Sequence, residues 1–250
     1  MLEIKEFNKI IVANWKLNGS NDFLEAYFEE LDSKNLRLNV CGVICPPTAY
    51  IQNCYSKLHS LYLGAQDCSK FKEGAYTGEI SASMLKENNC IFCIVGHSER
   101  RQVFKENNED IKIKAAQLLD EKIIPIICIG ETLEQKKMHK THEVLKEQVI
   151  NSLPQNSSKE SVVIAYEPIW AIGSGKTATL AQIEEMAKEI HTIVGNFYQH
   201  FSQLRITVLY GGSVKPDNAK EILGLPSVDG LLIGGASLVP KNMEQILSFC

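Results

Sequence analysis

Short apolar runs alternate with amphipathic segments along the whole chain. Eight of these runs are rich in β-branched residues and show no regular polar alternation, which indicates strands that are buried on both faces. They cover residues 10–13, 40–45, 61–63, 91–95, 123–129, 162–166, 206–209 and 228–233. Such strands are typical of parallel sheets, in which a helix follows each strand.

The segments between the runs carry a helical pattern. Apolar residues recur at intervals of three and four positions, and Thr179 with Gln182 forms a capping-box pair at the start of one segment. Examples are Leu24, Tyr27, Phe28 and Leu31; Ile111, Ala115, Leu118 and Leu119; Leu145, Val149 and Leu153; and Met243, Ile246 and Leu247. Eight strands alternating with helices predict an α/β fold that closes as a (β/α)8 barrel, with a doubly wound open sheet as the alternative.

A single domain is expected for residues 1–250. This length is common among single-domain α/β barrels, and no low-complexity linker divides the chain. Residues 151–160 are interpreted as a polar loop and not as a domain boundary.

The glycine-rich stretch GSGKTA at residues 173–178 resembles two nucleotide-binding signatures, but it fits neither. A Walker A loop requires a glycine where this chain has Trp170. A dinucleotide fingerprint begins at the end of a strand, whereas the preceding apolar run stops at Tyr166. The stretch therefore indicates a glycine-rich loop between a strand and a helix.

Charge and composition exclude several kinds of partner. The formal net charge is -4, so the chain has no general attraction for nucleic acid or for an anionic membrane. No apolar run approaches the roughly 20 residues that span a bilayer. The N-terminal sequence MLEIKEFNK lacks the apolar core of a signal peptide, which favours a cytoplasmic protein.

The 8 cysteines are scattered through apolar surroundings, which favours reduced thiols in the core over a disulfide framework. Cys90 and Cys93 have a CxxC spacing, but no second pair accompanies them. His139 and His142 lie in a polar segment without an apparent partner ligand. We therefore expect no metal site.

Polar residues and glycines follow several of the predicted strands. In a parallel barrel the active site lies at the C-terminal ends of the strands. Glycine pairs after the seventh and eighth strands allow backbone N–H groups to approach a ligand closely, which favours a phosphate site over simple tight turns. These groups are Asn14 and Lys16; His97; Glu167 and Pro168; Gly211, Gly212 and Ser213; and Gly234 and Gly235.

Three of these side chains can carry acid–base chemistry. Glu167 at the barrel mouth can act as a base, and His97 can polarise a carbonyl or move protons. Lys16 supplies the positive charge that an anionic ligand needs. Taken singly, each residue also fits a structural role in the core, on the surface or in an ion pair.

Together these motifs resemble the triosephosphate isomerase family over essentially the whole chain. The matching segments are NWKLNG at 14–19, GHSERR at 96–101, AYEPIWAIGSGKTA at 165–178, YGGS at 210–213 and GGASL at 234–238. The resemblance implies a single (β/α)8 TIM barrel and the interconversion of dihydroxyacetone phosphate and D-glyceraldehyde 3-phosphate through an enediolate. This reaction belongs to glycolysis and gluconeogenesis, and it needs no cofactor.

The resemblance also implies roles for individual residues. Glu167 is the base that moves the proton, His97 polarises the carbonyl as a neutral imidazole whose pKa a helix N-terminus lowers, and Asn14 and Lys16 stabilise negative charge. Residues 169–176 form a lid. The phosphate-binding groups then include Gly173, Ser213, Gly234 and Gly235 beside Asn14 and Lys16.

A homodimer is implied as well, in which the loop at residues 66–81 enters the partner subunit. Thr77 is then expected near the partner's Asn14 and Lys16. Asp67 stands where the family usually has Asn, and Leu17 where it usually has Met, so these two positions put the strength of the interface in question. Ser174 likewise replaces the usual Thr in the lid.

Two rival functions remain open at this point. Another phosphate-binding barrel, such as an aldolase, needs a Schiff-base lysine inside a strand, and the eight apolar runs contain no lysine. A catalytically silent barrel would be expected to lack Glu167, His97 or Lys16, and all three are present.

Overall fold

The computed structural model describes residues 2, 4–31, 39–154, 162–172, 177–197 and 206–250. Within them the strands form one closed parallel barrel in chain order. The strands are β1 Lys9–Asn14, β2 Val40–Cys45, β3 Tyr62–Ala65, β4 Phe92–Val95, β5 Ile124–Ile129, β6 Val162–Tyr166, β7 Ile206–Tyr210 and β8 Gly230–Ile233. Because β1 pairs with β8, the predicted (β/α)8 barrel is confirmed and the open-sheet alternative is wrong.

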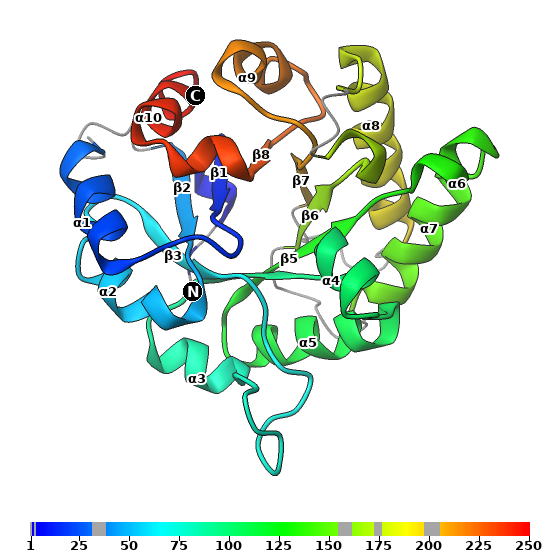
Figure 1. Cartoon of the computed structure of the whole chain (residues 1–250). Coiled ribbons are helices and arrows are strands. Elements are labelled where there is room, and N and C mark those ends of the chain that lie inside the picture. The colour runs from blue at the N-terminus through cyan, green and yellow to red at the C-terminus, as the bar shows by residue number, and fades with distance from the viewer. Residues whose placement is uncertain (1, 3, 32–38, 155–161, 173–176, 198–205) are drawn as a thin grey trace.

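The helices surround the strands as an outer ring (Figure 1). They are α1 Asn21–Glu30, α2 Ile51–Tyr55, α3 Ala82–Glu87, α4 Ser98–Val103, α5 Asn108–Asp120, α6 Leu133–Lys137, α7 Thr141–Ser152, α8 Leu180–Phe197, α9 Pro216–Leu223 and α10 Pro240–Ser248. Short 3-10 turns complete the described elements: η1 Ile4–Glu6, η2 Thr48–Tyr50, η3 Ile169–Ala171 and η4 Gly235–Leu238. Side-chain caps explain where several helices begin; the Ser20 hydroxyl, for example, accepts the Phe23 N–H at the start of α1.

Two apolar cores explain why the strands show no polar alternation. In β1, Ile10 and Val12 belong to the core inside the barrel, whereas Ile11 and Ala13 pack against the helices. The other strands alternate in the same way, so each strand is buried on both faces. All the cysteines are free thiols, and all except Cys250 are buried, as predicted.

Some element boundaries differ from the prediction. Strand β8 begins at Gly230 and not at Val228. A Cβ atom at Gly230 would lie 1.8 Å from the Ile10 carbonyl oxygen, so this glycine permits the close approach of β1 and β8. Asn151 and Ser152, predicted as loop, form the last turn of α7. Among the described helices, none combines the length and the apolar character needed to cross a membrane.

Candidate active site

A pocket of about 600 Å³ opens at the C-terminal ends of the strands. It brings together four predicted residues from three separate strand ends: Asn14 and Lys16 after β1, His97 after β4, and Glu167 after β6. The glycine loops after β7 and β8 line its opposite side, and they include Gly211, Gly212, Ser213, Gly234 and Gly235. Residues that lie far apart in the chain, from Asn14 to Gln245, thus share one cavity.

Lys16 is held in an unusual backbone conformation. Its φ angle is 52°, in the left-handed region that non-glycine residues rarely adopt. The Asn14 side-chain oxygen accepts the Lys16 backbone N–H at 3.0 Å, and the Gln66 side-chain amide donates to the Lys16 carbonyl at 2.8 Å. These two bonds fix both ends of the strained residue. The Lys16 ammonium lies in the pocket, 2.5 Å from Glu99 Oε1.

Gln66 is a residue that the sequence analysis placed only within the predicted interface loop. Its amide also donates to the Cys45 carbonyl at 2.9 Å, so it joins the end of β2 to the loop after β1. No motif in the sequence marks this role, because it depends on three strand ends lying side by side.

His97 lies directly between the end of β4 and the start of α4. Its Nδ1 atom accepts the backbone N–H of Glu99 at 3.2 Å, so the imidazole caps the helix. Its Nε2 atom lies 3.0 Å from Glu167 Oε1. Because Nδ1 accepts a hydrogen bond, the ring proton belongs on Nε2, which faces the pocket.

Glu167 follows β6 and is almost completely buried, with a relative exposure of 2%. Its Oε2 atom accepts the Ser98 backbone N–H at 3.0 Å, while Oε1 faces His97. The carboxylate is therefore held by two groups at the N-terminus of α4. Helix N-termini favour negative charge, which suits this placement.

The buried pair shifts both pKa values in opposite directions. Burial raises the pKa of Glu167, but the charge and hydrogen bond of His97 and the Ser98 N–H lower it more, so it lies below its ordinary value. Burial lowers the pKa of His97, but the Glu167 carboxylate outweighs burial and raises it. In this arrangement the His97 pKa is therefore raised and not lowered as the resemblance implied, because the Glu167 and Glu99 carboxylates together outweigh burial.

Glycines shape the opposite wall. A Cβ atom at Gly234 would lie 3.2 Å from the Lys16 Cε atom, and one at Gly211 would lie 2.9 Å from the Glu167 Cγ atom. At Gly235 an added Cβ would meet nothing within 4 Å. Gly211 and Gly234 therefore leave room for the two charged side chains, whereas Gly235 keeps its backbone open to the cavity.

The first end of the predicted lid is anchored by Glu131, which the sequence analysis did not single out. Glu131 is buried beyond the end of β5, where it accepts the Trp170 indole N–H at 2.7 Å and the Tyr166 hydroxyl at 3.2 Å. Its signal in the sequence was a carboxylate at a strand end, just before the capping box of α6. Gly173 and Ser174 lie outside the described residues.

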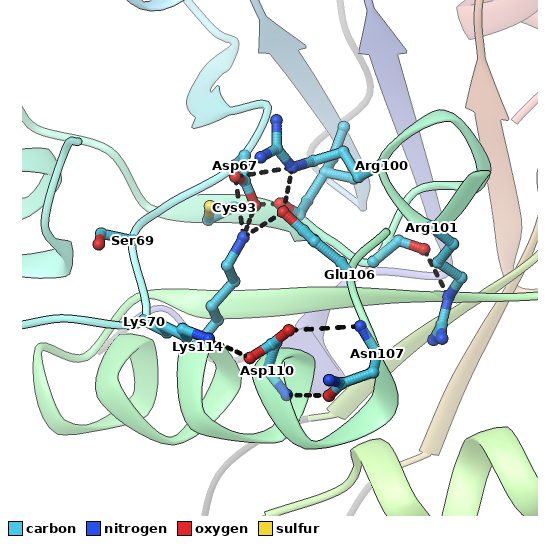
Figure 2. A network of polar contacts seen from close by, with 12 residues as sticks. Asp67, Ser69, Lys70, Cys93, Arg100, Arg101, Glu106, Asn107, Asp110 and Lys114 are labelled. Atoms are coloured by element: carbon cyan, nitrogen blue, oxygen red, sulfur yellow. Dashed lines mark hydrogen bonds and ion pairs between the residues drawn. The ribbon is translucent and has the colours of Figure 1, made fainter. Parts of the chain in front are cut away.

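The predicted interface loop projects beyond the ring of helices, between β3 and α3 at the bottom of Figure 1. Thr77 is exposed on it, and Leu17 is 95% exposed at the mouth of the barrel. Asp67, at the base of this loop, belongs to a polar network (Figure 2). Its carboxylate lies 2.8 Å from Lys114 Nζ and 2.8 Å from Arg100 Nε.

The two remaining patterns from the sequence have ordinary structural surroundings. Cys90 and Cys93 are buried at the start of β4. His142 lies 3.3 Å from Glu189 on the surface. Within the described part of the chain, no group of three or more histidine, cysteine or acidic residues could hold a metal ion.

Comparison with known proteins gives a consistent result. The sequence model of triosephosphate isomerase matches residues 9–250. The triosephosphate isomerase of Mycoplasma capricolum is 43% identical over 244 residues, covering 96% of this chain and 98% of that protein. The one from Herminiimonas arsenicoxydans is 44% identical over 250 residues, with 96% and 98% covered. The crystal structure of triosephosphate isomerase from Bartonella henselae matches with a TM-score of 0.88 at 35% identity, covering 97% of this chain and 99% of that one. On a closed eight-stranded barrel with this pocket, such matches over nearly the full length place the chain in the triosephosphate isomerase family.

Proposed function

We propose that Glu167, His97, Lys16 and Asn14 carry the reaction of this enzyme, the reversible isomerisation of dihydroxyacetone phosphate and D-glyceraldehyde 3-phosphate in glycolysis and gluconeogenesis. The observation that carries the proposal is one pocket in which a buried carboxylate, an imidazole N–H and an ammonium converge. A proton transfer next to a carbonyl needs these three kinds of group.

The proposed reaction moves one proton between neighbouring carbons. The Glu167 carboxylate takes a proton from C1 of dihydroxyacetone phosphate, and the electron pair of that C–H bond forms the C1–C2 double bond of the enediolate. The carbonyl electrons move onto the C2 oxygen, where the His97 Nε2–H and the Lys16 charge stabilise them. Glu167 then returns the proton to C2, and a proton moves from the C1 oxygen to the C2 oxygen. Atoms and charge balance without a cofactor.

The charged groups of the site are paired with one another. Glu167 bonds to His97 and the Ser98 N–H, and Lys16 bonds to Glu99. We infer that Glu167 turns from α4 toward the substrate carbon, which frees the His97 N–H for the carbonyl oxygen.

The phosphate group is proposed to lie against the glycine loops. Ser213, Gly234 and Gly235 line the cavity together with Lys16, and their backbone N–H groups are proposed to bind the phosphate. Gly173 of the lid completes the proposed set. Closure of the lid would exclude water and protect the enediolate from losing its phosphate. The bond between Trp170 and Glu131 supports a fixed N-terminal end of the lid.

A homodimer is proposed as the working form, with Thr77 near the partner's Asn14 and Lys16. The projecting loop between β3 and α3 and the exposed apolar side chains around it support this proposal. Those side chains are Leu17, Tyr76, Met84, Val103 and Phe104. We further propose that residues 1–250 form one domain, which the closed barrel supports, and that the enzyme is cytoplasmic, which its free thiols support.

The test of the proposed function is an isomerisation assay of the purified protein beside Glu167→Gln. The variant is expected to lose roughly 10²- to 10⁴-fold in kcat, since general-base catalysis contributes about that much. Glu25→Gln is the matched control, because Glu25 is exposed and pairs with Lys57 outside the pocket. Turnover of the folded Glu167→Gln dimer at the wild-type rate would refute the role of Glu167, and a folded wild type without activity would indicate a silent barrel.

A further inference from the structure

Arg101 lies beneath the turn that presents His97, and the sequence motif gave it no role. It is the fourth residue after His97, in the last turn of α4. Its backbone N–H donates to the His97 carbonyl at 3.1 Å, and its side-chain Nε donates to the Gly96 carbonyl at 2.8 Å. One residue therefore bonds the carbonyls of both Gly96 and His97.

The turn itself has little freedom to adjust. Gly96 has a φ angle of 68°, a conformation that favours glycine. A Cβ atom there would lie 2.6 Å from the Ile111 side chain and 3.2 Å from the Arg101 guanidinium. The peptide that leads into His97 is thus packed between α5 and Arg101.

The rest of the guanidinium reaches three other elements. It donates to the Cys128 carbonyl on β5 at 3.0 Å, to the Asn108 side chain at the start of α5 at 2.6 Å, and to the Ser152 hydroxyl on α7 at 3.4 Å. All these acceptors are neutral, and among the described residues no carboxylate lies within ion-pair distance of Arg101. A rigid planar fork can serve several fixed acceptors at once, which a single ammonium cannot do.

The neighbouring Arg100 behaves differently. Figure 2 shows it directed at Asp67 and Glu106, while Arg101 points away from that network. Two adjacent arginines on α4 thus have different partners. Arg100 forms ion pairs, whereas Arg101 donates hydrogen bonds to carbonyl and side-chain oxygens around the His97 turn.

We propose that Arg101 is a positioning residue for His97: it fixes the Gly96–His97 peptide against β5, α5 and α7, so that the imidazole Nε2–H keeps its direction into the pocket. This inference rests on the proposed role of His97. It predicts that loss of the guanidinium lowers kcat while leaving the binding of the phosphate group nearly unchanged, because the hydrogen bonds of the Arg101 side chain involve none of the described phosphate-binding residues.

Arg101→Met and Arg101→Lys test the proposal. For Arg101→Met we expect kcat to fall roughly 10- to 100-fold, the size of effect that a misplacement of about 1 Å produces, with KM changed by less than about threefold. Arg101→Lys should recover part of the loss, because an ammonium can still bond one carbonyl. The ¹⁵N signals of the His97 ring should shift in both variants. They should stay unchanged in the control Arg100→Lys, which also removes one guanidinium group from α4.

A milder variant covers the case in which Arg101→Met fails to fold. Asn108→Ala removes one acceptor of the guanidinium, and it should shift the His97 signals and lower kcat in the same direction by a smaller factor. A folded Arg101→Met or Asn108→Ala with wild-type kcat and unchanged His97 signals overturns the inference. His97→Gln distinguishes failure of the proposed function from failure of this inference. Wild-type activity in His97→Gln would refute the role of His97 itself. Loss of activity in His97→Gln but not in the Arg101 variants would refute only the positioning role of Arg101.

Discussion

At the scale of single residues, the site depends on charges that share one buried space. Glu167 and His97 each shift the pKa of the other, and both are nearly closed to solvent. The imidazole is restrained at both nitrogens, because Nδ1 accepts the Glu99 N–H and Nε2 faces Glu167. Its protonation state therefore depends on where the carboxylate lies, which links the position of Glu167 to the acidity of His97.

Glu167→Gln should lower the pKa of His97 in the free protein. The substitution removes the charge that raises this pKa, while burial, which lowers it, stays. The measurement is a ¹H–¹⁵N titration of the His97 ring in the wild type and the variant. A His97 titration midpoint that stays the same or rises in the variant would show that the carboxylate does not control the imidazole.

At the scale of elements, the strand ends are brought together so closely that a glycine is required between them. Gly130 directly follows β5, and a Cβ atom there would lie 1.7 Å from the Glu167 carbonyl oxygen. The Glu167 backbone N–H donates to the carbonyl of Ile129, the residue before Gly130, at 2.7 Å. The backbone that carries the proposed base thus rests directly on the end of β5.

Gly130→Ala should therefore affect stability and catalysis together. The added methyl group cannot fit without moving the Glu167 peptide, and overpacking of this kind costs about 1–3 kcal/mol in the free energy of unfolding. Gly195→Ala is the control, because Gly195 lies in α8 and a Cβ atom added there would lie 4.0 Å from the nearest atom, Ile206 Cδ1. Alanine in a helix stabilises the protein by roughly 0.5–1 kcal/mol relative to glycine. Urea unfolding and kcat of both variants give the comparison; equal stability and activity in the two would contradict the packing argument.

At the scale of the whole molecule, a network of partly buried charges links the base of the projecting loop to α4 and α5. Asp67 meets Lys114 and Arg100, and Glu106 meets the same two cations (Figure 2). Burial raises the pKa of Asp67 to about 6, although the nearby Lys114 charge lowers it in part. Burial therefore makes Asp67 harder to ionise than an exposed carboxyl, whereas its charge helps to raise the pKa of Lys114.

Asp67→Asn should gain stability relative to the wild type as the pH rises from 4 to 7. A carboxyl whose pKa rises on folding, here from 3.8 to about 6, contributes stability below pH 3.8 that is lost as the pH rises toward 6. The difference in the free energy of unfolding should thus shift in favour of the variant by ~1–3 kcal/mol between pH 4 and pH 7. Its absolute value also contains the loss of the ion pairs with Lys114 and Arg100. Urea unfolding at one fixed protein concentration from pH 4 to pH 8 measures the difference. A difference that does not depend on pH would refute the assignment.

Much of the fold could be predicted from the order of apolar runs, because strands buried on both faces must be parallel and covered by helices. Sequence motifs also located Asn14, Lys16, His97 and Glu167 in the pocket, since each lies at or within two residues of the end of a strand and carries a side chain with no packing purpose there. Local signals could not give the ends of β3 and β8, because those ends depend on how closely a neighbouring strand approaches.

What the sequence by itself determined is therefore the alternation of strands and helices, the family and the choice of the proposed reactive groups, because these follow from local periodicity and from residues in short motifs. Tertiary structure alone decided the 3.0 Å pair between His97 and Glu167, the support of Lys16 by Gln66, the anchoring of Trp170 by Glu131 and the reach of Arg101 across three elements. Each of these contacts joins residues from different strand ends or helices. Their distances exist only once the barrel has closed, and with them the pKa values that control the proposed chemistry.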